Sequence, residues 1–325
     1  MPNFKPRQKL VYYIDDVYGE NSAYSLYGLG KIKKYRYLAR TLHGWLPEII
    51  NIDPITIIGA HYALENKDQL IITHRMDQQE YLRKNGYSGA ISIGSPFIYL
   101  PKPEKERNGF LIIVNHGVGD NKTTGNIRVF DVIQEVISYG ISKNNIKLLV
   151  HNNDCNNLEY LSGVQKLGIT IVPGAKGRDY TTFSRLANLF SSCEGVYTNA
   201  IGSHVVYANY FGCPVFFTKK IHHVELKNYM HLPGFEKIPI EIAKKENDLM
   251  RPENLKAVYP FLFDNKNQAF VDWAAKELGE EQKKPGEFLA ELFGWTSLND
   301  LKYIARRVLA NILPEIIKKN LWFVR

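Results

Sequence analysis

The 325-residue sequence predicts an α/β protein with two domains, each built on a mainly parallel sheet, followed by a helical C-terminal segment. Apolar runs typical of strands alternate with stretches of helical spacing, as in βαβ units. This alternation occurs twice, and a proline-rich, charged segment at residues 96–109 separates the two series. The chain is also longer than one hydrophobic core usually serves. Two domains are therefore expected.

The first domain is expected to span residues 1–103, and its strands are short. Apolar runs that predict strands occur at residues 10–14, 56–60, 69–73 and 90–93. A basic amphipathic helix is expected at residues 31–41, and a second helix is expected at residues 76–85, where Gly86 ends it. These elements predict a small α/β layer.

The second domain, expected at residues 104–265, shows the alternation more clearly. Its five predicted strands occupy residues 110–114, 146–150, 169–172, 195–198 and 215–218. Helices between them are expected at residues 129–139, 158–167 and 204–211. A further helix is expected to follow the turn at residues 173–179 and to end at about residue 191. Such repeats are typical of a doubly wound domain, which binds ligands outside the C-terminal ends of its strands.

The remaining segments of the chain differ in character. Residues 219–252 are rich in His, Lys and Pro and are predicted to be irregular. The C-terminal segment, residues 266–325, is predicted to be helical, with helices at residues 267–278, 286–293 and 298–321. Pro314 is expected to kink the last of these helices or to restart it.

Composition favours an anionic partner inside a reducing compartment. The net charge of +8 fits a nucleotide, an anionic lipid surface, a charged glycan or nucleic acid. The basic residues are scattered rather than gathered in one tract, so a nucleic-acid partner is not expected. Three widely spaced cysteines, no apolar leader and no apolar run of membrane-spanning length together predict a cytoplasmic protein.

The strongest candidate for a ligand site is the small-residue turn after the fourth strand of the second domain. Gly202 and Ser203 lie where a strand turns into a helix, and the unpaired amides of a helix start bind phosphates and other anions. Candidate binding residues at this edge of the sheet are His116, Gly117, Asn152, Gly174, Arg178, Thr198, Asn199, Gly202, Ser203 and His204. The alternative is that glycine and asparagine only form turns here and that the histidines are structural.

Candidate catalytic residues lie in the first domain. Asp15 and Asp16 end its first strand, and one of them or His43 could take the proton from an attacking hydroxyl. The alternative is that the two carboxylates cap a turn and that Trp45 is a core or cleft-wall aromatic. A metal site is not expected, because the other histidines lack ligand spacing. The motifs of common hydrolases, kinases and zinc peptidases are absent.

The segment Thr198-Asn-Ala-Ile-Gly-Ser-His204 with Gly212-Cys-Pro214, set in the second of two Rossmann-like halves, resembles the GT-B fold glycosyltransferases of bacterial surface polysaccharide (capsule and lipopolysaccharide) biosynthesis. His43-Gly-Trp45 and Gly94-Ser-Pro-Phe97 are similar to segments of poorly characterised proteins from such gene clusters. The resemblance implies two Rossmann-like domains that face a cleft. It also implies a nucleotide-sugar donor on the second domain, a glycan or lipid-linked glycan acceptor on the first, and neither cofactor nor metal.

The resemblance leaves the donor open. The glutamate pair that commonly binds the ribose and the sugar is absent, and a CMP-linked acidic sugar would fit the basic charge. A nucleotide-sugar 2-epimerase of the same fold and a non-catalytic glycan- or nucleotide-binding protein are the alternatives. The final helix carries Lys318 and Lys319 beside apolar residues, so it either contacts an anionic membrane surface or packs onto the protein.

Overall fold

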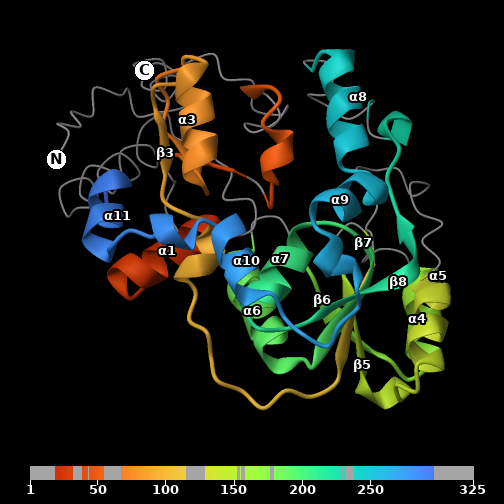
Figure 1. Ribbon diagram of the computed structural model, residues 1–325. Helices are drawn as coiled ribbons and strands as arrows, with labels where there is room; N and C mark the ends of the chain where they lie inside the picture. The colour runs from red at the N-terminus through yellow and green to blue at the C-terminus, as the bar shows by residue number, and fades with distance from the viewer. Residues whose placement is uncertain are drawn as a thin grey trace, which may run out of the picture.

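The computed structural model describes residues 19–31, 39–42, 44–54, 67–114, 129–151, 154, 158–175, 179–228, 230 and 238–295. Two parallel sheets form within these residues (Figure 1). The smaller sheet has the order β1-β2-β3 and contains β1 (Arg40–Thr41), β2 (Ile71–Thr73) and β3 (Ala90–Ser92). The larger sheet has the order β6-β5-β4-β7-β8 and contains β4 (Phe110–Ile113), β5 (Ile146–Val150), β6 (Thr170–Pro173), β7 (Gly195–Ala200) and β8 (Val215–His222).

Helices cover both faces of the five-stranded sheet. They are α4 (Val129–Ser138), α5 (Leu158–Lys166), α6 (Thr182–Ser192) and α7 (Ser203–Tyr210). Successive strand side chains point to opposite faces. Ile112 of β4 accordingly packs with α4, whereas Leu111 and Ile113 belong to a cluster with α6 and α7. The predicted parallel α/β architecture is confirmed, and each of the five strands lies within a few residues of its expected position.

The strand order has a consequence for the site. The chain runs from β4 outward to β6 and then returns to place β7 on the other side of β4, where Ile113 pairs with Thr198. The C-terminal ends of β4 and β7 therefore lie side by side in the sheet. This reversal of strand order is the place where doubly wound sheets bind ligands.

The remaining helices surround the two sheets. They are α1 (Glu20–Leu29), α3 (Met76–Lys84), α8 (Ile240–Leu249), α9 (Pro252–Val258), α10 (Val271–Glu277) and α11 (Gly286–Leu292). Short 3-10 turns include η1 (Glu48–Ile50), η3 (Pro96–Tyr99), η4 (Lys143–Asn145), η6 (Leu226–Asn228), η8 (Pro260–Phe263) and η9 (Glu280–Gln282). In Figure 1, α3 and β3 lie on one side, the large sheet lies on the other, and residues 101–108 form an extended connection along the bottom.

Four expectations about local structure were wrong. The helix expected at residues 31–41 does not reach its end, because Arg40 and Thr41 pair with β2 as a strand. Helix α1 forms where no helix was expected, and β8 and α8 extend into the segment expected to be irregular. The expected linker begins with the buried turn η3, where Ser95 caps the start and Phe97 is fully buried. The strands expected at residues 10–14 and 56–60 and the helix at 298–321 lie outside the described residues.

One hydrophobic cluster joins the two sheets. It contains Tyr24 of α1, Phe97 of η3, Leu111 of β4, Val205 of α7 and Phe293 after α11. The closing helices contribute to this contact, because α11 packs on α1 and α10 packs on α7. The domain boundaries at residues 103 and 265 stay predictions. No helix among the residues placed by the structure is both long and apolar enough to cross a membrane.

Candidate functional site

The turn after β7 has the geometry of an anion-binding helix start. β7 ends at Ala200 and α7 begins at Ser203, with the extended residue Gly202 between them at the N-cap position. The cap residue makes no side-chain hydrogen bond to the helix start. The positive end of the helix dipole and its first amides are therefore not capped by the side chain that usually occupies this place.

Thr198 orients the imidazole of His204. Thr198 is fully buried, and its Oγ1 lies 3.0 Å from His204 Nε2 and accepts a hydrogen bond from the Ala200 N–H at 3.1 Å. Asn199 beside it is also buried. Thr198 thus acts on the site through His204, which the contact holds in one ring orientation.

Gly174 lies at the same edge of the sheet, directly after β6. Its N–H donates to the Val150 carbonyl at 2.8 Å, and its own carbonyl accepts from Arg185 Nη2 at 2.7 Å. A Cβ at this position would lie 2.7 Å from Leu149 Cδ2, so the close approach to β5 requires glycine. Arg185 also pairs with Asp179 at 2.8 Å. Burial alone would raise the pKa of Asp179, but hydrogen bonds from Thr181 and Arg185 lower it to about 2.

Ser203 joins the turn to the first half of the chain. Its Oγ accepts a hydrogen bond from the backbone N–H of Trp45 at 2.8 Å, and its hydroxyl also bonds to the Tyr207 side chain. Tyr207 in turn bonds to Ser95 and stacks on Phe97 with the ring centroids 3.7 Å apart. Gly44 and Trp45 therefore lie directly against the start of α7.

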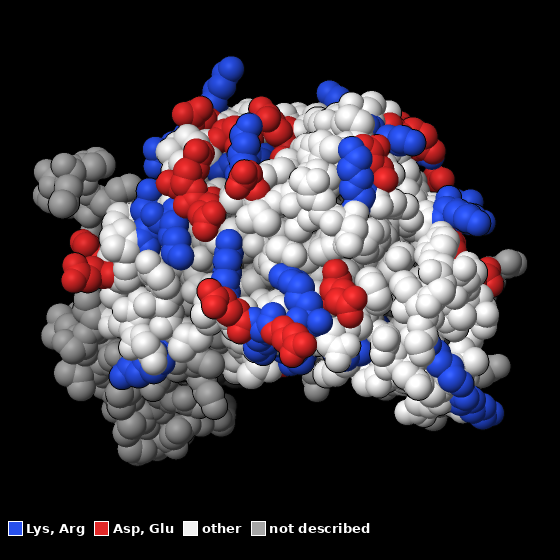
Figure 2. All heavy atoms as spheres, turned by 60° about the horizontal axis from the view of Figure 1, so that its bottom comes forward, with Lys and Arg blue, Asp and Glu red and all other residues white. Residues whose placement is uncertain are grey.

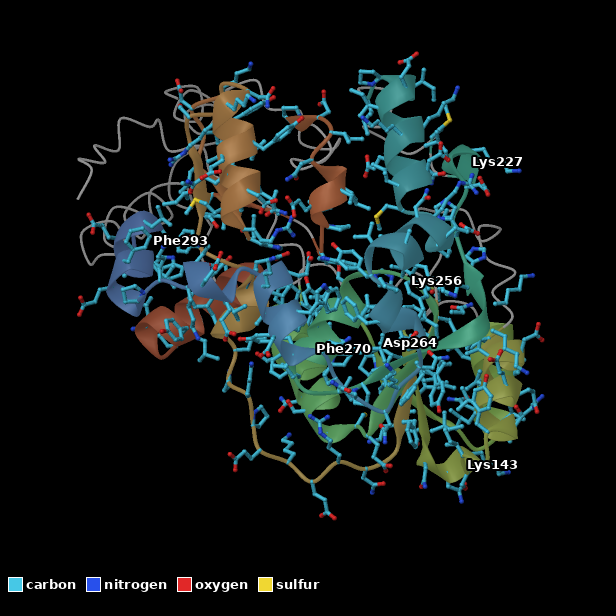
Figure 3. The ribbon with its side chains drawn as sticks, viewed as in Figure 1. Lys143, Lys227, Lys256, Asp264, Phe270 and Phe293 are labelled. Carbon is cyan, nitrogen blue, oxygen red and sulfur yellow. The ribbon has the colours of Figure 1, made fainter. Side chains whose placement is uncertain are left out.

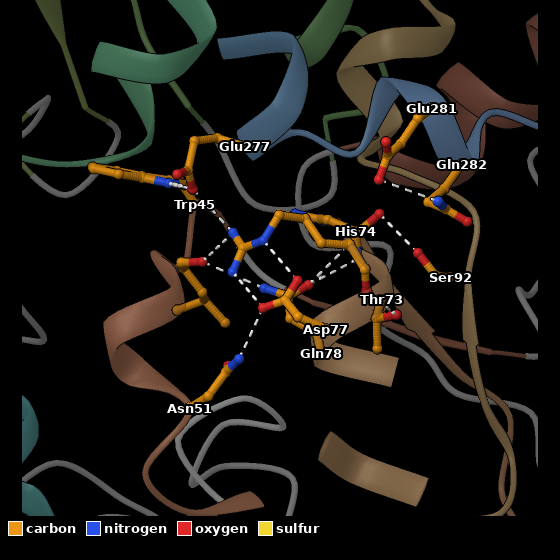
Figure 4. Close-up of polar contacts among 12 residues, drawn as sticks. Trp45, Asn51, Thr73, His74, Asp77, Gln78, Ser92, Glu277, Glu281 and Gln282 are labelled. Carbon is orange, nitrogen blue, oxygen red and sulfur yellow. Dashed lines mark hydrogen bonds and ion pairs between the residues drawn. The ribbon is translucent and has the colours of Figure 1, made fainter. Parts of the chain in front are cut away.

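Trp45 is held by a buried carboxylate at the end of α10 (Figure 4). Its Nε1 donates to Glu277 Oε2 at 2.8 Å, and Arg75 Nη1 donates to the same oxygen at 3.0 Å. The other oxygen, Oε1, accepts from the Tyr259 hydroxyl at 3.0 Å. The Trp45 ring packs against Tyr259 and Trp273, so the interpretation of Trp45 as a core aromatic is confirmed.

Arg75 completes this buried cluster. It donates through Nε and Nη2 to both carboxylate oxygens of Asp77, at 2.9 and 3.0 Å, and through Nη1 to the Leu46 carbonyl at 2.8 Å. Burial by itself would lower the pKa of Arg75, but the bond to Asp77 and the charge of Glu277 raise it. Burial would raise the pKa of Asp77, and the bond to Arg75 brings it below its usual value. Arg75 and Asp77 therefore hold each other in their charged forms.

The end of β8 and helix α8 border the turn on its other side. His222 pairs with Ala200 in the sheet, and His223 Nε2 lies 3.2 Å from Asn247 Oδ1 on α8. Helix α8 also contacts η1, the turn that follows Trp45 in the chain. Burial, and then the charges of His223 and Lys220, lower the pKa of His222.

Glu246, which precedes Asn247 on α8, has an unusual environment. Burial raises the pKa of its carboxyl to about 7, and no hydrogen bond or ion pair to it occurs in the described part of the chain. Lys227 and Lys256 lie on the same side of the molecule (Figure 3). A carboxyl that titrates near neutral pH can both give and take a proton under physiological conditions.

The Lys and Arg side chains do not form a separate basic patch on the face shown in Figure 2. Figure 2 shows Lys and Arg side chains beside Asp and Glu side chains across the face that it presents. Among the residues that the structure describes, no group of three or more His, Cys, Asp or Glu is placed to hold a metal ion.

The structure places six of the predicted site residues, and five of them lie at the end of β7, in the turn after it or at the start of α7. Those five are Thr198, Asn199, Gly202, Ser203 and His204, and Gly174 lies at the same sheet edge. Seven predicted residues lie outside the described part of the chain: Asp15, Asp16, His43, His116, Gly117, Asn152 and Arg178. Sequence reasoning missed Glu277 entirely, because its partner Trp45 is 232 residues away and no local pattern connects them.

Comparison with known proteins adds little to this geometry. No protein-family model and no curated protein matches the sequence. A solved structure of a TarM variant from S. aureus, in complex with fondaparinux, α-GlcNAc-glycerol and UDP, matches with a TM-score of 0.34 and 12% sequence identity. The match covers 78% of this chain and 49% of that one, so the chain spans about half the length of that protein. A likeness at this level leaves the function to be argued from the residues themselves.

Proposed function

We propose that the protein is a glycosyltransferase that moves a sugar from a nucleotide-sugar donor to a glycan or lipid-linked glycan acceptor. The observation that carries the proposal is the hydrogen bond from the Trp45 N–H to Ser203 Oγ, at 2.8 Å. It joins a segment of the first half that contains a candidate base to the anion-binding turn of the second half. Sugar transfer requires this proximity, because the acceptor hydroxyl must be activated beside the leaving phosphate.

The second half would bind the donor. The uncapped start of α7 and the imidazole of His204 would offset the negative charge that develops on the leaving phosphate. Gly174 and Asn199 lie at the same edge of the sheet. The remaining proposed donor contacts follow β4, β5 and β6 in the sequence: His116, Gly117, Asn152 and Arg178. These groups supply the charge stabilisation, so the proposed reaction uses neither cofactor nor metal.

The first half would bind and activate the acceptor. Asp15, Asp16 or His43 would take the proton from the acceptor hydroxyl as its oxygen forms a bond to the anomeric carbon. The bond from that carbon to the donor phosphate breaks, and the nucleotide leaves with the bonding electron pair. We place the reaction in bacterial surface polysaccharide synthesis in the cytoplasm, where lipid-linked acceptors would bring the protein to an anionic membrane surface.

His204→Ala is the variant that tests this proposal. A double variant that also removes the Ser203 hydroxyl would confuse folding with function, because that hydroxyl bonds to Trp45 and Tyr207. We first identify the nucleotide by the thermal shift that UDP, GDP, CDP, CMP and dTDP produce, and then measure sugar transfer by mass spectrometry. His204→Ala should lower transfer at least about 100-fold, as expected for the loss of a group that stabilises transition-state charge.

The matched control is His223→Ala, which removes a histidine at the end of the neighbouring strand. It should retain transfer within about threefold, because the loss of one hydrogen bond costs only about 1 kcal/mol in stability and leaves the turn intact. Full transfer by His204→Ala would overturn the proposed donor site. Donor consumption without acceptor would instead identify an epimerase or a hydrolase. Nucleotide binding without turnover would identify a binding protein.

A further inference from the structure

Glu277 gathers three hydrogen-bond donors from three separate segments of the chain. Its Oε2 accepts from Trp45 Nε1 at 2.8 Å and from Arg75 Nη1 at 3.0 Å, and its Oε1 accepts from the Tyr259 hydroxyl at 3.0 Å. The residue is only 8% exposed. Such a carboxylate is costly to bury unless it is paired and fully hydrogen-bonded, which this one is.

The donors fix the carboxylate, and the carboxylate fixes Trp45. The indole ring has aromatic neighbours in Tyr259 and Trp273, with the ring centroids 5.9 and 5.7 Å away. Its Nε1 has one acceptor, Glu277, so the ring cannot rotate without breaking that bond inside the core. Charge-assisted bonds of this kind are stronger than neutral ones and hold a defined geometry.

The backbone of Trp45 and Leu46 is also held by two hydrogen bonds. The Trp45 N–H donates to Ser203 Oγ at 2.8 Å, and the Leu46 carbonyl accepts from Arg75 Nη1 at 2.8 Å. Arg75 thus contacts Glu277 and Leu46 through one nitrogen. A displacement of the Glu277 carboxylate would move Trp45 and Arg75, which both donate to it. It would therefore also move the contact between the Trp45 N–H and Ser203 at the start of α7.

We propose that Glu277 is a positioning residue of the proposed transferase. It holds the segment Gly44–Leu46, which directly follows the candidate base His43 in the chain, against the anion-binding turn without touching either substrate. This inference rests on the proposed function. An error of about 1 Å in the placement of reacting groups lowers rates by about 100-fold, so a remote carboxylate can control the reaction.

Glu277→Gln is the first test, because the amide keeps the size of the side chain but cannot accept from all three donors. We expect kcat to fall about 10- to 100-fold while the donor KM changes less than about threefold, since the donor contacts remain. Rates are compared well below the unfolding temperature of each variant. Glu280→Gln is the matched control: Glu280 accepts from the Tyr210 hydroxyl at 2.7 Å and should leave kcat unchanged.

A spectroscopic readout tests the contact without any reaction. The chain has four tryptophans, and the 15N–1H indole signal of Trp45 is assigned by its loss in Trp45→Phe. This signal should shift in Glu277→Gln and stay in place in Glu280→Gln. If Glu277→Gln fails to fold, Trp45→Phe takes its place, because it keeps an aromatic ring and the backbone N–H but removes the Nε1 donor. It should show the same loss of kcat.

The outcomes separate this inference from the proposed function. A shifted indole signal with a reduced kcat and an unchanged donor KM supports the positioning role. A shifted signal with full kcat, or a signal that does not shift, overturns it while the transferase stands. Absence of transfer by the unmodified protein with every donor overturns the proposed function and the positioning role together, whatever the indole signal shows.

Discussion

Glu246 should make the protein less stable as pH rises, and Glu246→Gln should remove that dependence. The carboxyl lies on α8 one turn from the buried residue Ala243, and burial raises its pKa from 4.5 to about 7. The charged groups on the elements that pack against α8 are Glu48 on η1, Lys227 on η6 and Glu253 on α9, together with Lys256. The structure shows no ion pair between any of them and Glu246 in the described chain.

The direction of this pH dependence follows from proton binding to the folded and unfolded states. Between pH 4.5 and about 7 the folded protein holds a proton on Glu246 that the unfolded chain has released, so the free energy of unfolding falls as pH rises through this window. At 1.36 kcal/mol per pKa unit, the rise from 4.5 to about 7 corresponds to a loss of at most about 3.4 kcal/mol. Above pH 7 the loss is complete. Partial solvent access reduces the value toward about 1 to 2 kcal/mol.

The assay is urea unfolding of the unmodified protein and of Glu246→Gln between pH 5 and pH 8. The amide cannot ionise, so the free energy of unfolding of the variant should rise relative to that of the unmodified protein by about 1 to 2 kcal/mol across this range. Glu241→Gln, an exposed carboxyl of the same helix, is the control and should follow the unmodified protein at every pH. A gap between Glu246→Gln and the unmodified protein that stays constant with pH would refute the reasoning.

Two further substitutions test individual backbone contacts, both measured by chemical unfolding. Gly279→Ala should lower the free energy of unfolding by at least about 2 kcal/mol more than Gly140→Ala. Both glycines have positive φ, but a Cβ at Gly279 would lie 1.9 Å from the His74 carbonyl oxygen, whereas nothing lies within 4 Å of one at Gly140; equal losses would contradict this contact. Arg107→Met should cost about 2 to 4 kcal/mol, because it removes the donor for three backbone carbonyls. A loss below about 0.5 kcal/mol would show that water replaces the guanidinium.

The sequence predicted the five-stranded sheet because its strands are buried on both faces. Strands of this kind are continuous apolar runs between turn residues, which local pattern detects well. The helix expected at residues 158–167 forms as α5, and Gly168 follows it with a φ of 79°. The turn before α7 was also predicted, because a glycine and a serine between an apolar strand and a helix are typical of a helix start.

Helices α1 and α8 could not be predicted from pattern for opposite reasons. Six residues at the start of α1, from Glu20 to Ser25, are buried although four of them are polar, so no apolar stripe marks the helix. In α8 charged residues make up half of the helix; Ala243 and Asn247 are buried, and Glu246 is half-buried. In both cases tertiary packing stabilises the helix, and the sequence does not show the helical spacing of apolar residues from which a helix could be predicted.

The long-range contacts of the site explain why its chemistry was only partly predictable. Sequence pattern predicted that Ser203 belongs to an anion-binding turn, and that prediction concerned one strand, one turn and one helix. The structure uses its hydroxyl to hold the Trp45 N–H, 158 residues away, and uses Glu277 to hold the indole of the same residue. An anion at this turn would therefore meet backbone amides and His204 rather than the Ser203 hydroxyl. Because Trp45 and Glu277 come from opposite ends of the chain, the geometry of the turn depends on segments outside its own sheet.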